Sequence, residues 1–252
     1  MTFDVPADAY ARFMGRFSEP LGVVFADFSG VAPGMSVLDV GSGPGALTTE
    51  LVRRVGPARV AAVDPSPPFV AALTDRLPEV DVRTAAAEHL PHDDDAFDAA
   101  LAQLVVHFMS DPVAGLREMA RVTRPGGVVA ACVWDHDGGD TPLSLCWTVA
   151  RELDPSAVDE SGLAGAHRGH LEELATAAGL SDIEGTKLHV DVEFGSFEEW
   201  WEPYTFGIGP LGAYIRSLDD DGRAALRERC AERLPAAPFT VRASAWAARA
   251  RA

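Results

Sequence analysis

Short apolar runs recur along the first half of the chain, and stretches with helical spacing of apolar residues separate them. The runs lie near residues 35–40, 59–63, 80–84, 97–102 and 127–134. Runs of this length are typical of buried strands. Their alternation with helical segments predicts parallel crossover connections, so we expect an α/β fold with a doubly wound sheet.

The pattern changes at both ends of this region. Residues of about 7–30 have the apolar spacing of two short helices before the first strand. After Trp134 a looser, glycine- and proline-containing stretch follows. Residues 186–194 and 239–247 are predicted as two final strands, with helical material between them.

One glycine-rich turn carries the strongest functional signal. Residues 37–48 read as an apolar strand, a turn with glycines at 41, 43 and 45, and the start of a helix. Glycine lets a ligand approach the backbone without meeting a Cβ, and a helix N-terminus offers unpaired N–H groups. A second apolar run ends in Asp64, about where a nucleotide-binding α/β unit places the carboxylate that holds a ribose. The sequence therefore predicts a site for an adenosine-containing cofactor.

Asp39 bears on which cofactor that is. The glycine spacing also fits the dinucleotide fingerprint, so a nicotinamide-dependent oxidoreductase is an alternative. An acid two residues before Gly41 would repel a pyrophosphate, whereas it suits a ligand with a cationic ammonium end.

The run Val37–Gly45 resembles the first motif, V-L-D-x-G-x-G-x-G, of the class I S-adenosylmethionine-dependent methyltransferases. Further segments resemble the later motifs in the same order: Asp64-Pro65-Ser66 with Phe69, Ala87-Glu88 before Leu90-Pro91, Phe97 to Ala100, and Arg124 to Gly127. The chain departs from the family at Ala86, where an acid often bonds the adenine amino group. Adenine recognition is then expected from backbone groups near Ala87 and Glu88, or from the Glu88 side chain.

The resemblance implies a Rossmann-like methyltransferase fold with a mostly parallel seven-stranded sheet, an antiparallel last strand and a helical substrate lid. It implies one domain over residues 1–252. N-terminal cap helices would occupy 1–30, the cofactor-binding core 31–134, lid insertions 135–180 and 195–235, and an edge hairpin 186–194 with 239–247.

S-adenosylmethionine is the cofactor that the resemblance implies. In this family the acid of the second motif binds the ribose, and residues after the fourth strand approach the methyl group. The expected cofactor-binding residues are Arg16, Asp39, Gly41, Ser42, Gly43, Gly45, Asp64, Pro65, Ser66, Phe69, Ala87, Glu88, Gln103 and Leu104.

Arg16 enters this set through the segment from Tyr10 to Ser18. That segment resembles an F-M-G-R-[WFY]-S stretch found before the first motif in one bacterial branch of the family. If it folds over the cofactor, Arg16 could pair with the methionyl carboxylate. The alternative is a surface helix whose Phe13 and Phe17 pack on the core.

His107 is the candidate catalytic base, since a neutral imidazole after the fourth strand could take a proton from an acceptor. The alternative is a histidine that packs at the top of the sheet and forms a hydrogen bond to a backbone carbonyl. Aromatic residues are expected to wall a pocket for the methyl acceptor: Tyr10, Trp134, Trp200 and Tyr204. His136 between two aspartates completes no ligand set, so we expect no metal.

Composition narrows the partners. The chain has 252 residues and a net charge of −17, which disfavours nucleic acid as the substrate. It has no apolar run long enough for a membrane span, and residues 1–10 lack a secretory signal pattern. Its three cysteines lack metal spacing and fit buried thiols in the cytoplasm.

The predicted activity is methyl transfer to a small, apolar or aromatic molecule. A protein of this fold that binds the cofactor or its demethylated product without transferring methyl is the other alternative. The sequence leaves the oligomeric state open, and it does not reveal whether oxygen, nitrogen, carbon or sulfur is methylated.

Overall fold

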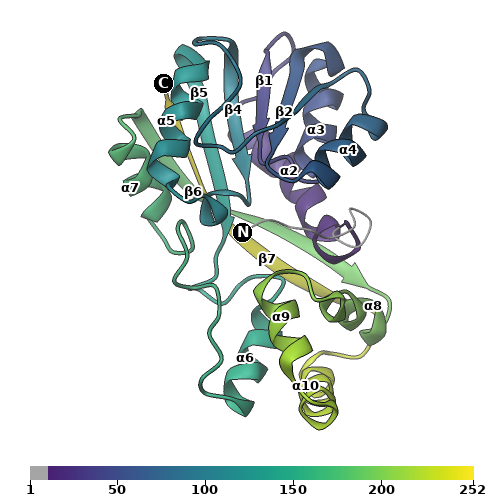
Figure 1. The fold of residues 1–252 in the computed structure, drawn as a ribbon. Coiled ribbons are helices and arrows are strands. Elements are labelled where there is room, and N and C mark those ends of the chain that lie inside the picture. The colour runs from purple at the N-terminus through teal and green to yellow at the C-terminus, as the bar shows by residue number, and fades with distance from the viewer. Residues whose placement is uncertain (1–10) are drawn as a thin grey trace.

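The computed structural model describes residues 11–252, in which strands and helices alternate through the first half of the chain (Figure 1). The strands are β1 (Val37–Val40), β2 (Val60–Asp64), β3 (Asp81–Thr84), β4 (Phe97–Gln103), β5 (Thr123–Trp134), β6 (Ser181–Phe194) and β7 (Phe239–Arg251). The α-helices are α2 (Arg16–Phe28), α3 (Ala46–Val55), α4 (Pro67–Arg76), α5 (Pro112–Val122), α6 (Ser144–Leu153), α7 (His170–Ala177), α8 (Phe197–Trp201), α9 (Gly209–Ser217) and α10 (Asp220–Arg233). Four short helical turns complete the described elements: η1 (Ala11–Gly15), η2 (Pro57–Arg59), η3 (Val106–Phe108) and η4 (Glu202–Phe206).

The seven strands form one sheet in the order β3-β2-β1-β4-β5-β7-β6. β1 to β5 pair in parallel, whereas β7 is antiparallel to both β5 and β6. The chain order reverses between β1 and β4, and open α/β sheets bind ligands beyond the carboxyl ends of the strands at such a point. The predicted mostly parallel sheet with an antiparallel last strand is therefore confirmed.

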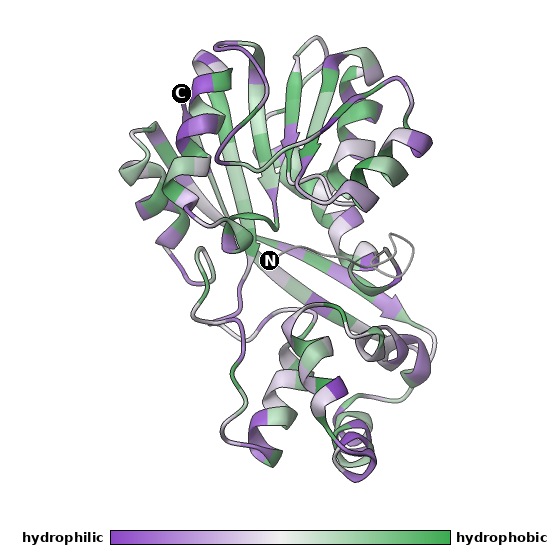
Figure 2. Ribbon diagram, in the orientation of Figure 1, coloured by the Kyte–Doolittle hydropathy of each residue, from purple (hydrophilic) through white to green (hydrophobic). Residues whose placement is uncertain are grey.

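Both faces of the sheet are covered, as alternating side chains on a strand require. Val37 of β1 belongs to an apolar cluster with α2 and α3, while Leu38 and Val40 belong to a second cluster with α5 and α7. All three side chains are fully buried. Apolar residues fill the central strands, and polar residues lie on the outer faces of the helices (Figure 2). The continuous apolar runs of the sequence thus reflect strands that are buried on both faces.

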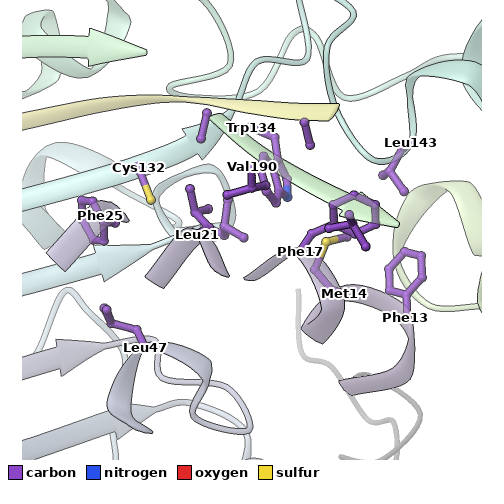
Figure 3. Packing of buried hydrophobic residues seen from close by; sticks show 14 of the residues in the cluster. Phe13, Met14, Phe17, Leu21, Phe25, Leu47, Cys132, Trp134, Leu143 and Val190 are labelled. Atoms are coloured by element: carbon purple, nitrogen blue, oxygen red, sulfur yellow. The ribbon is translucent and has the colours of Figure 1, made fainter. Parts of the chain in front are cut away.

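The N-terminal region differs from the predicted pair of short helices. Over the described residues, the π-helical turn η1 runs directly into α2. Phe17, Leu21 and Phe25 are spaced four residues apart and share the buried face of α2, which points toward the strands (Figure 3). Because this apolar face runs from Phe17 to Phe25, residues 16–28 form one helix.

Beyond the sheet, β6 and β7 extend toward a group of four helices, α6, α8, α9 and α10 (Figure 1). Both strands are longer than predicted, because they pair with each other from Ser181–Arg251 to Phe194–Phe239 and this pairing draws in residues without an apolar pattern. Trp147, Trp200 and Leu211 from these helices belong to the same apolar cluster as Leu21 of α2. Within residues 11–252, no helix has the length and apolar character needed to cross a membrane.

Candidate active site

The three glycines of the turn after β1 are all left-handed, with φ of 73° at Gly41, 53° at Gly43 and 92° at Gly45. Their surroundings differ. A Cβ at Gly41 would lie 2.4 Å from Val105 Cγ2, and one at Gly45 would lie 2.4 Å from Leu73 Cδ1. At Gly43 a Cβ would meet nothing within 4 Å. Gly43 therefore leaves open space toward a ligand, whereas the other two allow close packing within the protein.

Asp64 stands at the end of β2 and joins this turn to the next one. Its Oδ2 accepts a hydrogen bond from the Gly43 N–H at 2.8 Å, and its Oδ1 accepts one from the Ser66 N–H at 2.8 Å. Burial raises the pKa of the Asp64 carboxyl, and the two backbone hydrogen bonds oppose that rise. Each carboxylate oxygen has a further lone pair, which is free to accept a hydrogen bond from a ligand hydroxyl.

Asp39 lies deeper, on β1, with a side chain that is almost fully buried. Its Oδ2 accepts a hydrogen bond from Thr48 Oγ1 of α3 at 2.6 Å. Burial raises the pKa of the Asp39 carboxyl to about 7, and the negative charge of Asp64 adds to the rise. A cationic group beside Asp39 would reverse part of this shift, because it favours the carboxylate.

These two acids line a cavity of about 320 Å³, a size typical of sites for small molecules and cofactors. The cavity lies over the carboxyl ends of β1, β2 and β4. Of the residues expected to bind the cofactor, it brings together Asp39, Gly41, Ser42, Gly43, Asp64, Pro65, Ser66, Phe69, Ala87, Glu88, Gln103 and Leu104. Residues outside the expected cofactor-binding set complete the lining: Gly15, Ser18, Glu19, Pro44, Ala46, Leu47, Arg76, Ala86, Val105, Phe108, Met109 and Ser110.

The added lining residues come mostly from two places. Gly15, Ser18 and Glu19 are on the N-terminal helical segment, and Met109 and Ser110 follow η3. The position of Ser18 is fixed in part by Gln103, whose Nε2 donates to the Ser18 carbonyl at 2.9 Å. Gly15 and Ser18 belong to the segment that was predicted to fold over the cofactor, whereas the sequence around Met109 and Ser110 carried no such prediction.

Glu88 has a defined role before any ligand binds. Its Oε1 accepts hydrogen bonds from the backbone N–H groups of Ser110 at 2.7 Å and Asp111 at 3.2 Å. These bonds tie the Ala86–Glu88 stretch to the N-terminus of α5. The Glu88 carboxylate is thus partly engaged, which leaves the backbone near Ala87 as the main polar surface for a base at this end of the cavity.

Arg16 does not line the cavity, which corrects its predicted contact with a cofactor carboxylate. Its Nη1 pairs with Glu199 Oε1 at 2.5 Å, and its Nη2 donates to the Glu193 carbonyl at 2.7 Å. Its guanidinium also stacks 4.4 Å from the centre of the Phe194 ring. These partners commit Arg16 to fastening α2 onto the end of β6 and α8.

Two of the predicted acceptor-binding aromatics are core residues. Trp200 and Tyr204 are almost fully buried and stack edge to face with ring centres 4.9 Å apart. The Tyr204 hydroxyl donates to the Pro142 carbonyl at 2.8 Å. Neither residue lines either cavity; both pack with the group of helices α6, α8, α9 and α10, which we call the lid. The prediction for Tyr10 lies outside the described residues.

A second, smaller cavity of about 40 Å³ holds His107 and Trp134 in its wall. We call it the inner chamber. It adjoins the larger cavity of about 320 Å³, because Leu104 and Phe108 line both cavities. Its other walls come from η1, the segments on either side of α6, and the start of α9: Phe13, Met14, His136, Leu143, Glu160, Ile208, Gly209, Pro210 and Leu211.

His107 is a neutral imidazole in this setting. Burial lowers the pKa of the His107 ring to about 3, and the neighbouring His136 adds to the decrease. The His107 Nδ1 atom is buried and has no hydrogen-bond partner among the described residues. His107 Nδ1 therefore does not form the hydrogen bond to a backbone carbonyl that the alternative predicts.

Over residues 11–252, no group of three or more histidine, cysteine or acidic side chains could hold a metal ion. Cys132, Cys146 and Cys230 are all buried free thiols.

Comparisons with known proteins identify the core of this site. The family model described as a methyltransferase domain matches residues 38–131. An uncharacterised methyltransferase of Mycobacterium tuberculosis is 38% identical over 135 residues, which cover 54% of this chain and 52% of that protein. The matched stretch therefore spans about half the length of this curated relative.

Solved structures match over nearly the whole chain. A possible histamine N-methyltransferase from Thermotoga maritima has a TM-score of 0.58 at 17% identity and covers 97% of this chain and 94% of its own. Phosphoethanolamine N-methyltransferase 2 of Haemonchus contortus, in complex with phosphomonomethylethanolamine and S-adenosylhomocysteine, has a TM-score of 0.60 at 17% identity and covers 97% and 56%. Identities this low establish the fold alone. Residues 38–131 therefore match a methyltransferase-domain family, S-adenosylmethionine is the cofactor that these matches support, and the chain has the Rossmann-like methyltransferase fold.

Proposed function

We propose that this protein catalyses S-adenosylmethionine-dependent methyl transfer to a small molecule. The observation that carries the proposal is the pair of adjoining cavities, a larger one lined by Asp39 and Asp64 and the smaller inner chamber, which share Leu104 and Phe108. Methyl transfer needs two ligands side by side with the sulfonium methyl between them. The shared wall is where that methyl would lie.

The chain's own residues would divide the work as follows. Asp64 would hold the ribose hydroxyls with its free lone pairs. Asp39 would face the methionyl ammonium, and the backbone at Ala87 the adenine. Methyl transfer is an in-line displacement, so positioning of the acceptor in a dry site supplies much of the acceleration. His107 would accept the proton when the acceptor arrives protonated.

The acceptor is proposed to be small and apolar or aromatic. The inner chamber is enclosed by apolar side chains from several segments, among them Phe13, Met14 and Ile208. A chamber of about 40 Å³ has room only for the reacting end of an acceptor, which supports a small acceptor. The net charge of −17 also disfavours a nucleic-acid acceptor. A cytoplasmic location stays a prediction from the cysteine pattern.

Calorimetric titration with S-adenosylmethionine, S-adenosylhomocysteine and NADH tests the cofactor assignment. We expect the first two to bind and NADH not to bind. Asp64→Ala should weaken S-adenosylmethionine binding roughly 10- to 100-fold, because hydrogen bonds to a charged group are lost. Asp93→Ala, on an exposed turn, is the matched control and should bind like the unchanged protein.

Turnover tests the reaction itself. The protein is incubated with S-adenosylmethionine and a panel of small phenols, alcohols and amines, and release of S-adenosylhomocysteine is measured. Binding of NADH alone would make the protein an oxidoreductase. Tight binding of S-adenosylmethionine with no product from any acceptor would favour the non-methylating alternative.

A further inference from the structure

The inner chamber contains polar atoms that the protein leaves without partners. Among the described residues, His107 Nδ1, Trp134 Nε1 and His136 Nε2 are buried and make no hydrogen bond. All three belong to side chains in the chamber wall. Buried polar atoms in native proteins are nearly always satisfied, so a cluster of this kind calls for a ligand or ordered water.

The arrangement of these groups suits a single small polar group. The ring centres of His107 and His136 are 6.1 Å apart, so a group between the rings could reach both. A neutral imidazole has one donor and one acceptor nitrogen, whereas the Trp134 indole only donates. The site therefore offers both hydrogen-bond donors and acceptors. A hydroxyl group can use both, because it donates one hydrogen bond and accepts others.

The charge of the chamber excludes ionised groups. No arginine or lysine is present in the described lining, so a phosphate or carboxylate would lack a counter-charge. Burial lowers the pKa of His136 to about 4, which keeps it neutral like His107.

Glu160, the one acid in the described lining, offers little to a cation either. The Glu160 Oε2 accepts a hydrogen bond from Trp147 Nε1 at 2.7 Å, and burial raises the pKa of the Glu160 carboxyl to about 7. A protonated amine would thus face a carboxyl group that is only partly ionised near neutral pH and that already accepts a hydrogen bond from Trp147.

Strain marks the wall between the cavities. Leu104 has a left-handed backbone with φ of 61°, which is rare for a residue with a branched side chain. Its N–H donates to the Cys132 carbonyl of β5 at 2.8 Å, and this bond holds the conformation. Backbone strain concentrates at functional sites, and here it places one side chain on the boundary of both cavities.

From these observations we infer that the inner chamber is the acceptor subsite and that it takes a neutral hydroxyl, a phenol or enol on an otherwise apolar molecule, held between His107 and His136. This inference rests on the proposed function. In the reaction the acceptor oxygen forms a bond to the methyl carbon as the carbon–sulfur bond breaks, and that electron pair returns to sulfur. Bond formation to the methyl carbon makes the acceptor oxygen oxonium-like and its proton strongly acidic, so the proton passes to His107 despite the low pKa of that ring, and from there to solvent.

Three matched aromatic probes test the inference with the protein saturated with S-adenosylhomocysteine: phenol, phenyl phosphate and benzylamine. Binding is measured by calorimetric competition or ligand-observed NMR. We expect phenol to bind at least tenfold more tightly than the two charged probes. With S-adenosylmethionine in place of the product, phenol should give anisole and S-adenosylhomocysteine in equal amounts. Equal or tighter binding of either charged probe would overturn the inference.

Two variants then locate the hydroxyl contact. His136→Leu should weaken phenol binding at least fivefold while S-adenosylhomocysteine affinity stays within twofold. His89→Ala changes an exposed histidine outside both cavities and should have no effect. Unchanged phenol binding in a folded His136→Leu protein contradicts the inference. If the unchanged protein does not bind S-adenosylmethionine, the proposed function is refuted instead. The two failures are therefore distinguishable.

Discussion

Asp39 is the residue whose protonation should control cofactor binding. Its carboxyl is buried and its pKa in the ligand-free protein is about 7. An ammonium group beside it would lower that pKa, so binding favours the carboxylate and releases a proton. The affinity for S-adenosylmethionine should therefore be highest above pH 7, where Asp39 is ionised, and should decrease as the pH falls below 7.

We therefore expect the dissociation constant of S-adenosylmethionine to rise by up to about tenfold per pH unit between pH 7 and pH 5.5. Calorimetry in two buffers of different ionisation enthalpy counts the released proton. Asp39→Asn removes the titrating group and should flatten the profile over this range. A profile of unchanged slope in that variant would assign the proton to another group, with the neighbouring Asp64 as the first candidate.

At the scale of elements, the N-terminal helix is fastened to the lid rather than to the ligand. Arg16 of α2 pairs with Glu199 of α8 and with the Glu193 carbonyl of β6. Sequence resemblance suggested a contact with the cofactor carboxylate. The two roles give different results when the side chain is removed.

Arg16→Ala should lower the free energy of unfolding by about 1 kcal/mol, through loss of a partly exposed ion pair and of the contact with the Phe194 ring. S-adenosylmethionine affinity should change by less than about threefold, whereas loss of a carboxylate contact would cost roughly tenfold or more. Urea unfolding and calorimetry measure the two quantities. Arg12→Ala, which breaks a more exposed pair with Glu202, is the comparison variant.

At the scale of the whole molecule, the sheet and the lid share one apolar cluster. Leu21 of α2, Trp134 of β5 and Leu211 of α9 all belong to it. Separation of the lid from the sheet would expose this surface to water, which is unfavourable in proportion to its area. The lid should therefore unfold together with the sheet.

We predict a single cooperative urea transition with the same midpoint by tryptophan fluorescence and far-UV circular dichroism. Trp147, Trp200 and Trp201 report on the lid, Trp134 and Trp246 report on the sheet, and the circular dichroism signal reports on all helices. S-adenosylhomocysteine at 100 times its dissociation constant should stabilise the protein by about 2.7 kcal/mol and shift both probes together. Two separated transitions would indicate that the lid is an independent folding unit.

Local sequence patterns predict the sheet and most of the residues that line the larger cavity. Buried parallel strands need continuous apolar runs, and a tight turn at a helix N-terminus needs glycine, so both leave local patterns that can be read. Asp39, Asp64 and Ala87 line the cavity, and their contacts with the cofactor stay predictions. These features depend on residues close together in the chain.

Features that depend on contacts between residues far apart in the chain appear only in the tertiary structure. Arg16 turned from the cavity because Glu199, far along the chain, offers it a charged partner. Gly45 proved to accommodate Leu73 of α4, and Trp200 proved to be a core residue, because each packs against an element whose position no local pattern specifies. The inner chamber brings together His107, His136 and Glu160 from three segments. These side chains are buried together because residues of the lid, such as Leu211, pack over them in the folded protein.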